Sequence, residues 1–273
     1  MVRRSRNVKI GFIGTGNMGA ALAQAVCKSM GGQDILLANR TPAKAEALAR
    51  ELGAATGTNA DAAKSCGWIF LGVKPQMMAG MLEGIAPILK ERKDRFVLVT
   101  MAAGLSCARI QEMAGGAYPV IRVMPNTPAA IGKGVLQFCG LGATQEELEQ
   151  FQTMMAPAGL VDQVPVNLID AASAVSGCGP AFAYLFIEAL ADGGVACGLP
   201  RDKAMAYAAQ MVSGAAQMVL ESGKHPGALK DAVCSPGGTT IQGVRTLEEH
   251  GFRAAAMDAV IAAYEKTLSL AKK

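Results

Sequence analysis

The stretch KIGFIGTGNMGAAL, residues 9 to 22, decides the fold class of this chain. It begins with a short apolar run, turns through Gly14-Thr15-Gly16-Asn17-Met18-Gly19 and continues into an alanine-rich helical pattern. Glycines at these places allow a tight turn, close approach of the backbone to a pyrophosphate, and close packing of helix on strand. A bare GxGxxG is weak evidence, but a motif that follows a strand and opens a helix is in its confirming context. The stretch therefore predicts a dinucleotide phosphate site at a helix start.

The first half of the chain continues with the same alternation of short apolar runs and helical patterns. The expected strands are 9–13, 35–38, 68–73, 96–100, 119–123, 135–138 and 160–164, and the expected helices include 20–30, 42–52, 75–89 and 145–155. Such alternation indicates βαβ units and a mostly parallel sheet covered on both faces. The pattern predicts an N-terminal Rossmann-type, doubly wound α/β domain over residues 1–164.

After about residue 165 the strand signals stop. Helices are expected at about 167–193, 201–222, 225–233, 239–249 and 252–271, which predicts an all-α domain over residues 165–273. The run from 171 to 191 is long enough to span a bilayer, but it contains Gly177, Gly179, Pro180 and Glu188, which favour a buried pair of helices in a soluble protein. Helices that are small and apolar on nearly every side must be buried on nearly every side. One chain can hardly do that, so we expect a homodimer through these helices.

The composition excludes several classes of protein. Hydrophobic residues make up 51% of the 273 residues and charged residues 18%, which rules out a disordered chain. The net charge of +4 comes from dispersed Lys and Arg, so we expect no nucleic-acid partner. The seven cysteines form no CxxC pair and no cluster with metal-ligand spacing, which predicts no metal site and a reducing, cytoplasmic location. The basic start lacks a cleavage pattern, so neither export nor membrane association is expected.

The end of the second expected strand indicates which dinucleotide binds. An NAD site usually places Asp or Glu there to bind the ribose 2′-hydroxyl. This chain has Asn39-Arg40-Thr41 instead, and Arg40 with two hydrogen-bonding neighbours suits a 2′-phosphate. NADPH is therefore the expected cofactor, with NADH as a weaker substitute, although a solvated arginine at a turn is the alternative interpretation.

Two later strand ends also carry small or rigid residues. They are GVKP, residues 72–75, and TMAAG, residues 100–104. Ligands bind at the carboxyl ends of strands in an open α/β sheet, so both turns are candidates for cofactor contact. Lys74 could serve as an acid or could only cap a turn, and the small residues 102–104 could either pack tightly or let a flat nicotinamide ring lie close.

The catalytic acid of a ketone reductase is missing from the sequence. The two histidines, His225 and His250, lie in polar contexts without an obvious carboxylate partner, and the long helix expected at 168–192 contains no lysine. A protonated cyclic imine would need no such acid, because it is already an activated hydride acceptor. The protein need only hold its anionic group and donate a hydrogen bond to its nitrogen.

The stretch CSPGGTTIQG, residues 234 to 243, supplies what such a substrate needs. After Pro236 the chain turns through Gly237-Gly238, and Thr239 and Thr240 begin a helix. Unpaired N–H groups at that start form a carboxylate site, with a threonine hydroxyl in the same turn.

At these residues the chain resembles the pyrroline-5-carboxylate reductases. The resemblance covers nearly the whole length, and LKDAVCSPGGTT is its most specific motif; the other motifs are GFIGTGNMG, VKP, MAAG, RVMPNTP, SGCGPAF and ADGGVACGLP. It implies a Rossmann domain, a helical domain interlocked with a partner chain, and reduction of 1-pyrroline-5-carboxylate to proline. The interlocked pair is compatible with a higher oligomer of dimers.

The resemblance also implies the roles of individual residues. The cofactor would be held by Ile13, Gly14, Thr15, Gly16, Asn17, Met18, Gly19, Asn39, Arg40, Thr41, Asn59, Val73, Lys74, Pro75, Met101, Ala102 and Ala103. The substrate carboxylate would be held by Ser235, Gly238, Thr239 and Thr240, with the Thr240 hydroxyl toward the ring nitrogen. Cys178 and Cys234 stand where serines are common in the family, and no catalytic role is expected for them.

Two other functions stay open on the sequence alone. One is an NADP-dependent oxoacid reductase of the same two-domain design, against which the lysine-free helix counts. The other is a non-catalytic NADP(H)-binding regulator, against which the intact Thr240 turn counts.

Overall fold

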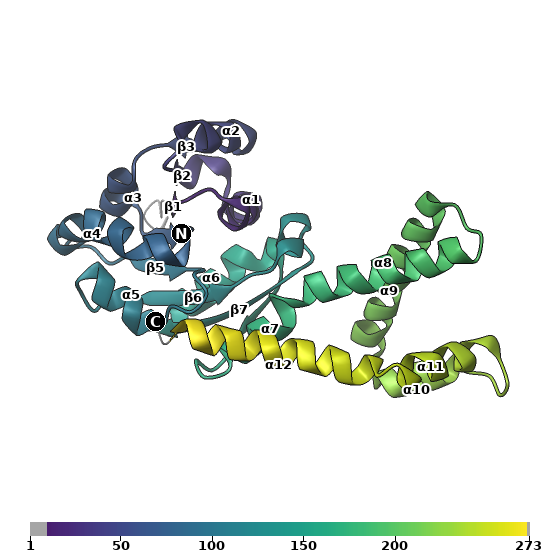
Figure 1. Cartoon of the computed structure of the whole chain (residues 1–273). Coiled ribbons are helices and arrows are strands. Elements are labelled where there is room, and N and C mark those ends of the chain that lie inside the picture. Colours follow the sequence, from purple (N-terminus) through teal and green to yellow (C-terminus); the bar gives the residue numbers. More distant parts are fainter. Residues whose placement is uncertain (1–9, 272–273) are drawn as a thin grey trace, which may run out of the picture. The chain divides into compact units, whose positions relative to one another are not determined.

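The structure, a computed structural model, describes residues 10–271, and within them one eight-stranded sheet carries the N-terminal half (Figure 1). The strands lie in the order β3-β2-β1-β4-β5-β6-β7-β8. Their bounds are β1 (Ile10–Ile13), β2 (Ile35–Ala38), β3 (Ala55–Thr56), β4 (Trp68–Leu71), β5 (Val97–Thr100), β6 (Val120–Met124), β7 (Gly134–Leu141) and β8 (Gly159–Gln163). The predicted doubly wound, mostly parallel α/β fold is confirmed.

Helices cover both faces of this sheet. Those between the strands are α1 (Asn17–Met30), α2 (Pro42–Leu52), α3 (Asn59–Ser65), α4 (Pro75–Glu91), α5 (Cys107–Ala114) and α6 (Gln145–Met155), with short 3-10 turns η1 (Gly32–Asp34), η2 (Thr127–Ile131) and η3 (Ala156–Ala158). Pro42 and Pro75 each lie in the first turn of their helices, where the missing N–H costs no hydrogen bond.

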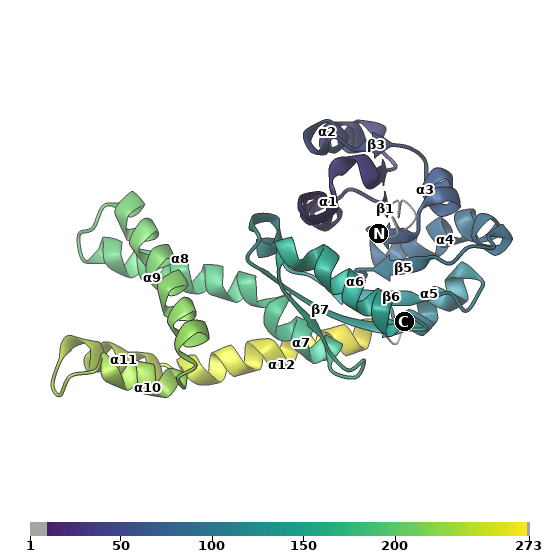
Figure 2. The same cartoon turned by 180° about the vertical axis from the view of Figure 1, so that it is seen from behind.

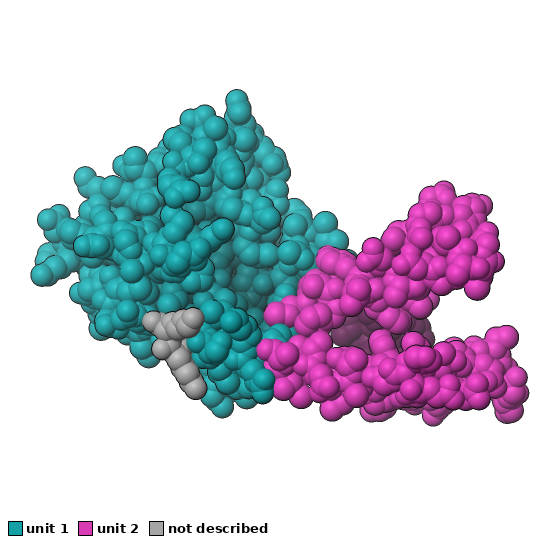
Figure 3. Space-filling model, viewed as in Figure 1, with its two compact units in different colours: residues 1–177, 263–273 teal, residues 178–262 magenta. Residues whose placement is uncertain are grey.

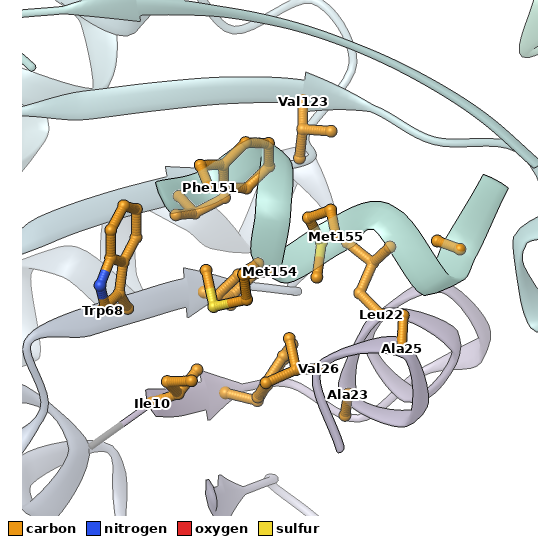
Figure 4. Packing of buried hydrophobic residues seen from close by; sticks show 14 of the residues in the cluster. Ile10, Leu22, Ala23, Ala25, Val26, Trp68, Val123, Phe151, Met154 and Met155 are labelled. Atoms are coloured by element: carbon orange, nitrogen blue, oxygen red, sulfur yellow. The ribbon is translucent and has the colours of Figure 1, made fainter. Parts of the chain in front are cut away.

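Alternation of side chains along the strands divides the core into two layers. Phe12 points to the layer formed with α1, α2 and α6, and the next residue, Ile13, points to the layer formed with α3, α4 and α5. Figure 4 shows the first layer, in which Phe151 and Met155 of the α6 region and Leu22 of α1 lie over the strands. Phe151 and Phe138 of β7 lie with ring centroids 5.0 Å apart. Burial on both faces explains why the strands are apolar throughout.

The one antiparallel pairing in the described sheet joins β6 to β7, with Arg122 opposite Cys139. Only η2 lies between these strands, whereas a parallel crossover needs about a dozen or more residues. The two-residue strand β3 was not predicted, because two exposed residues give no periodic signal. The predicted strand 68–73 ends instead at Leu71, since Gly72 and Val73 already form a turn.

The chain divides into two compact units, which are coloured in Figure 3. Unit 1 comprises residues 1–177 and 263–273, and unit 2 comprises residues 178–262. The helices after the sheet are α7 (Ile169–Ser176), α8 (Gly179–Ala196), α9 (Arg201–Ser222), α10 (Pro226–Ala232), α11 (Thr239–Glu249) and α12 (Phe252–Ala271), seen from behind in Figure 2. The predicted helical C-terminal half is confirmed, and the domain boundary between 164 and 165 stays a prediction.

The helix α7 belongs with the sheet because it packs on it. Ile169 is fully buried in the second core layer, and the Arg122 guanidinium of β6 donates to Asp170 at 2.5 Å. Arg122 is itself buried, so this ion pair joins β6 to α7 inside the unit.

Of the two expectations for this segment, a pair of helices is confirmed, and one continuous helix over about 168–192 is wrong, because the helix is interrupted between α7 and α8. Pro180 has no N–H with which to bond the carbonyl of Ser176, four residues earlier. That carbonyl accepts from Asn126 Nδ2 instead, at 3.0 Å, and the Ser176 hydroxyl bonds with Gln137. Side chains of unit 1 therefore satisfy the helix end that the proline leaves open.

The helices after the break expose large apolar side chains. In α8, Tyr184 is 58% and Leu185 68% exposed, and in α9 Leu220 is 80% exposed. The segment Ile169–Ala196 has the length and composition of a membrane span, and 11% of its most apolar window is buried. The burial predicted for this segment is therefore not provided by the described residues of a single chain.

Candidate functional site

The dinucleotide motif lies where the winding of the sheet reverses, between β1 and β4. Gly14 has φ +102°, and a Cβ there would lie 2.6 Å from the Gly72 carbonyl oxygen. A Cβ on Gly72 would lie 2.4 Å from the Gly14 oxygen, and one on Gly19 would lie 2.2 Å from the same atom. Three glycines thus let the two strand ends and the start of α1 meet backbone to backbone. Such a switch point is where open α/β sheets bind ligands.

The start of α1 is open for an anion. Gly16 is its N-cap, is exposed, and has nothing within 4 Å of the place where a Cβ would stand. The first helical hydrogen bond runs from Ala20 N–H to the Gly16 carbonyl, and no side chain caps the turn. The N–H groups of Asn17, Met18 and Gly19 therefore remain available to a phosphate at the positive end of the helix.

A buried hydroxyl in the same loop also lacks a partner. Thr15 is 7% exposed, and its Oγ1 has no hydrogen-bond partner among the described residues. A buried hydroxyl of this kind costs free energy unless something bonds it. Together, the open space over Gly16 and this hydroxyl fit the pyrophosphate of a dinucleotide.

A cavity of about 1100 Å³ continues from this loop along the ends of β1, β2 and β4. Of the predicted cofactor residues, it is lined by Ile13, Gly14, Gly16, Asn39, Arg40, Thr41, Asn59, Val73 and Lys74. Five others adjoin lining residues along the chain: Thr15 lies between Gly14 and Gly16, Asn17, Met18 and Gly19 begin α1, and Pro75 begins α4. The cavity is large enough for a ligand of dinucleotide size.

The far side of the cavity is cationic. Arg40 and Lys44 are both exposed and both line it, next to the start of α2. The helix has no side-chain cap at Thr41, so its first N–H groups face the same region. Lys44 was missed in the sequence. The signal for it was a second cation in the first turn of the helix that follows Arg40.

Asn59 is held in place by the start of α3. The Thr58 hydroxyl accepts from Asp61 N–H at 3.1 Å, and the Asp61 carboxylate accepts from Thr58 N–H at 2.8 Å. This capping box fixes the first turn, of which Asn59 is the first residue. Hydrogen bonds from the Thr58 backbone and hydroxyl lower the pKa of Asp61, so its carboxylate stays ionised.

The turn after β5 contributes Met101, Ala102 and Ala103. Ala102 is buried, and its N–H donates to the Thr100 hydroxyl at 3.3 Å, which folds the turn back onto the strand. Thr100 lies opposite Leu71 in the parallel pair of β5 with β4, so the turn follows the same edge of the sheet. These three residues are not among those that line the cavity itself.

The predicted substrate residues lie in unit 2, at the start of α11. Gly237 has φ +69°, a conformation that favours glycine, and Gly238 N–H donates to the Ser235 carbonyl at 3.0 Å. A Cβ on Gly238 would lie 2.3 Å from the Ser235 hydroxyl oxygen, so this hydroxyl rests over the bare glycine. Thr239 and Thr240 follow as the first helical residues and are exposed, and no side chain caps the helix. The turn brings a serine hydroxyl and free N–H groups together.

Both histidines have local structural roles. His225 is the N-cap of α10 and its Nδ1 accepts from Gly227 N–H at 3.0 Å, while His250 Nδ1 bonds the Thr246 carbonyl oxygen at 2.8 Å. Neither geometry prepares the ring for proton transfer to a substrate. Over residues 10–271, no three His, Cys, Asp or Glu side chains gather in a group that could hold a metal.

Two family models match the chain. One describes pyrroline-5-carboxylate reductase dimerisation and matches residues 167–270, and the other describes an NADP oxidoreductase, coenzyme F420-dependent, and matches residues 9–104.

Named relatives match over nearly the whole length. A pyrroline-5-carboxylate reductase of Pisum sativum is 40% identical over 269 residues, covering 97% of each chain. One of Escherichia coli is 41% identical over 269 residues, covering 97% of this chain and 98% of the relative. Both matches therefore span nearly the whole of this chain.

Solved structures of pyrroline carboxylate reductases also match this chain over nearly its whole length. A pyrroline carboxylate reductase of Plasmodium falciparum with NADP bound superposes with a TM-score of 0.87 at 31% identity, over 97% of this chain and 98% of that one. A pyrroline-5-carboxylate reductase of Coxiella burnetii gives a TM-score of 0.89 at 29% identity, over 98% of this chain and 100% of that one.

Proposed function

The chain belongs to the pyrroline-5-carboxylate reductase family, as its resemblance predicted, and we propose that it reduces 1-pyrroline-5-carboxylate to L-proline with NADPH, the last step of proline biosynthesis. The observation that carries this proposal is the start of α11. A serine hydroxyl over a bare glycine, free helix N–H groups and a threonine hydroxyl are grouped there without a catalytic histidine or lysine. That set suits a small anionic imine better than a ketone.

NADPH binds to several regions of unit 1. The pyrophosphate binds the loop from Ile13 to Gly19, where Gly16 leaves space and the Thr15 hydroxyl gains a partner. The 2′-phosphate binds beside Arg40 and Lys44 at the start of α2, where charge-assisted hydrogen bonds favour it over the 2′-hydroxyl of NADH. Asn39, Thr41 and Asn59 complete the adenosine end, and residues 73–75 and 101–103 flank the ribose and nicotinamide. When bound, NADPH supplies the hydride.

The substrate is held by the turn before α11. Ser235 and the N–H groups of Thr239 and Thr240 bind its carboxylate beside Gly238, whose own N–H is held by the Ser235 carbonyl, and the partial positive charge of the helix start favours the anion. The Thr240 hydroxyl bonds the ring nitrogen and fixes which face of the ring receives the hydride. The imine nitrogen carries its own proton, so these residues orient and bind and need not act as acids.

The chain works as a homodimer through its C-terminal helices, compatible with a higher oligomer of dimers. The match to a dimerisation model over residues 167–270 supports an oligomer, and the exposed apolar side chains of α8, α9 and α12 support where it forms. In this proposal the apolar segment is buried in that interface rather than in a bilayer. The scattered cysteines support a cytoplasmic location without a membrane partner, and the dispersed Lys and Arg support the absence of a nucleic-acid partner. The helical domain is taken as residues 165–273 and the dinucleotide domain as residues 1–164.

Consumption of NADPH in the presence of 1-pyrroline-5-carboxylate, beside a panel of 2- and 3-oxoacids, tests the proposal. We expect turnover with the imine and none with the oxoacids. Turnover of an oxoacid alone would show an oxoacid reductase, and binding of NADPH without any turnover would show a regulator.

A further inference from the structure

Asn39 lies between the two anion sites of the dinucleotide cavity. It directly follows β2, is half-buried, and stands where an NAD site usually carries Asp or Glu. Arg40 and Thr41 follow it on one side, and the loop after β1 lies on the other, so its side chain is placed to contact both.

The amide uses both of its ends inside the protein. Its Oδ1 accepts from Thr15 N–H at 3.1 Å, and its Nδ2 donates to the Thr41 carbonyl at 3.0 Å. The same Thr41 carbonyl accepts from Lys44 N–H at 3.1 Å, within the first turn of α2. One side chain thus links the phosphate loop to the turn that carries both cations.

This link bears on the unpartnered hydroxyl of the loop. Thr15 is 7% exposed and its Oγ1 lacks a partner among the described residues, so its position is set through its backbone, which Asn39 holds. Loosening the amide would release the Thr15 backbone and, with it, the buried hydroxyl that lies between Gly14 and Gly16, both of which line the cavity.

A carboxylate could not replace this amide. Asp has acceptors at both oxygens, so it could still accept from Thr15 N–H but would place an acceptor against the Thr41 carbonyl oxygen. Its charge would also repel a 2′-phosphate beside Arg40. The same carboxylate would accept a hydrogen bond from the ribose 2′-hydroxyl of NADH. Only an amide serves both contacts.

We propose that Asn39 is a positioning residue which couples the phosphate loop to the 2′-phosphate turn and thereby sets the preference for NADPH over NADH. This rests on the proposed function in its choice of cofactor. It separates two roles: Arg40 reads the 2′-phosphate alone, whereas Asn39 supports the binding of the pyrophosphate as well.

The two roles predict different patterns of affinity. Asn39→Ala removes both contacts, so it should weaken NADPH by roughly tenfold or more and NADH by roughly threefold or more, because both cofactors share the pyrophosphate. Arg40→Ala should weaken NADPH by roughly tenfold to a hundredfold and leave NADH within about twofold. Asn39→Asp keeps the Thr15 contact, so it should weaken NADPH at least as much as Asn39→Ala does and leave NADH unchanged or tighter.

The experiment is a titration of the full-length protein with NADPH and with NADH, without substrate, followed by the fluorescence of the nicotinamide. Dissociation constants are compared for the wild type, the three variants and Asn167→Ala, an exposed asparagine of the same unit, as control. Thermal unfolding of each variant shows that it is folded. If Asn39→Ala does not fold, Asn39→Asp still tests whether Asn39 sets the preference between the two cofactors.

Loss of NADH affinity in Asn39→Ala but not in Arg40→Ala, with NADH binding retained in Asn39→Asp, supports the coupling role. An Asn39→Ala that behaves like Arg40→Ala, or like the control, overturns it. Because binding is measured without substrate, a lack of turnover with 1-pyrroline-5-carboxylate would reject the proposed function and leave this result intact.

Discussion

Gly238→Ala should cost substrate binding while leaving the fold intact. The new Cβ would lie 2.3 Å from the Ser235 hydroxyl oxygen, so that oxygen must move by roughly 1 Å or more to reach van der Waals distance. The backbone of Gly238, with φ −75° and ψ 173°, is one that alanine adopts freely. The methyl therefore displaces the hydroxyl, and its other close neighbour, the Ser235 carbonyl oxygen at 3.1 Å, must shift by only a few tenths of an ångström.

The magnitude follows from the bond that is lost. A hydrogen bond to a carboxylate contributes about 1.5–3 kcal/mol, so kcat/KM for 1-pyrroline-5-carboxylate should fall by roughly tenfold to 150-fold, mostly through KM. Stability should be unchanged or rise by about 0.4–1 kcal/mol, because alanine restricts the unfolded chain. Activity and stability should thus move in opposite directions.

Steady-state kinetics and thermal unfolding of three variants decide the matter. Ser235→Ala removes the same hydroxyl without adding bulk, and it should match Gly238→Ala. If the methyl acts only by displacing that hydroxyl, the double variant should be no worse than Ser235→Ala alone. Costs that add in the double variant, or a Gly238→Ala enzyme with the wild-type KM, would refute the reasoning.

Three further results are expected. Thr240→Ala and Thr240→Val should each lower kcat/KM roughly tenfold to a hundredfold without changing the NADPH dissociation constant. Wild-type kinetics in both variants would show that Thr240 only begins the helix and has no role in the reaction. Ala181 is exposed in the single chain, and Ala181→Trp should abolish both association and activity by overpacking the interface. A fully active monomer in sedimentation would rule the dimer out. Gly177 is a poorer site for this test, because a Cβ there would lie 2.8 Å from a carbonyl oxygen of its own helix. Burial raises the pKa of Glu147. The bidentate hydrogen bonds from Arg95 and the hydrogen bond from Thr144 at the start of α6 lower it by more, so the net pKa lies below its ordinary value. The stability from this shift is present above the unfolded pKa and is lost as pH falls through the folded pKa, so Glu147→Gln should lose about 0.5–1.5 kcal/mol at pH 7 and flatten the acid limb of unfolding curves.

The parts of the fold that could be predicted are those with a repeated local signal. Seven of the eight strands and the motif from Gly14 to Gly19 were found because apolar runs and glycines at fixed spacing report a local geometry. The break between α7 and α8 was indicated by Gly177, Gly179 and Pro180, but the sequence did not decide between a pair of helices and one long helix. Whether a proline ends a helix depends on what satisfies the freed carbonyl, here Asn126 from the turn between β6 and η2.

Many of the residues that line the cavity could be predicted from the sequence, but the contacts between them could not. Arg40 stands out because a cation replaces a carboxylate at a known position, and the turn before α11 stands out because its glycines interrupt a helical region. The close approach of Gly14 to Gly72 and the two bonds of Asn39 join segments that are distant along the chain. Such contacts leave no pattern in a single sequence.

The most direct test of the central claim follows the hydride itself. NADPH that carries deuterium at the transferable position of its nicotinamide is incubated with the protein and 1-pyrroline-5-carboxylate, and the product is examined by mass spectrometry and NMR. The account predicts proline with one deuterium at the ring carbon that had been doubly bonded to nitrogen, formed by the wild type and more slowly by Thr240→Val. Unlabelled proline, or NADPH consumed without any proline, would contradict it.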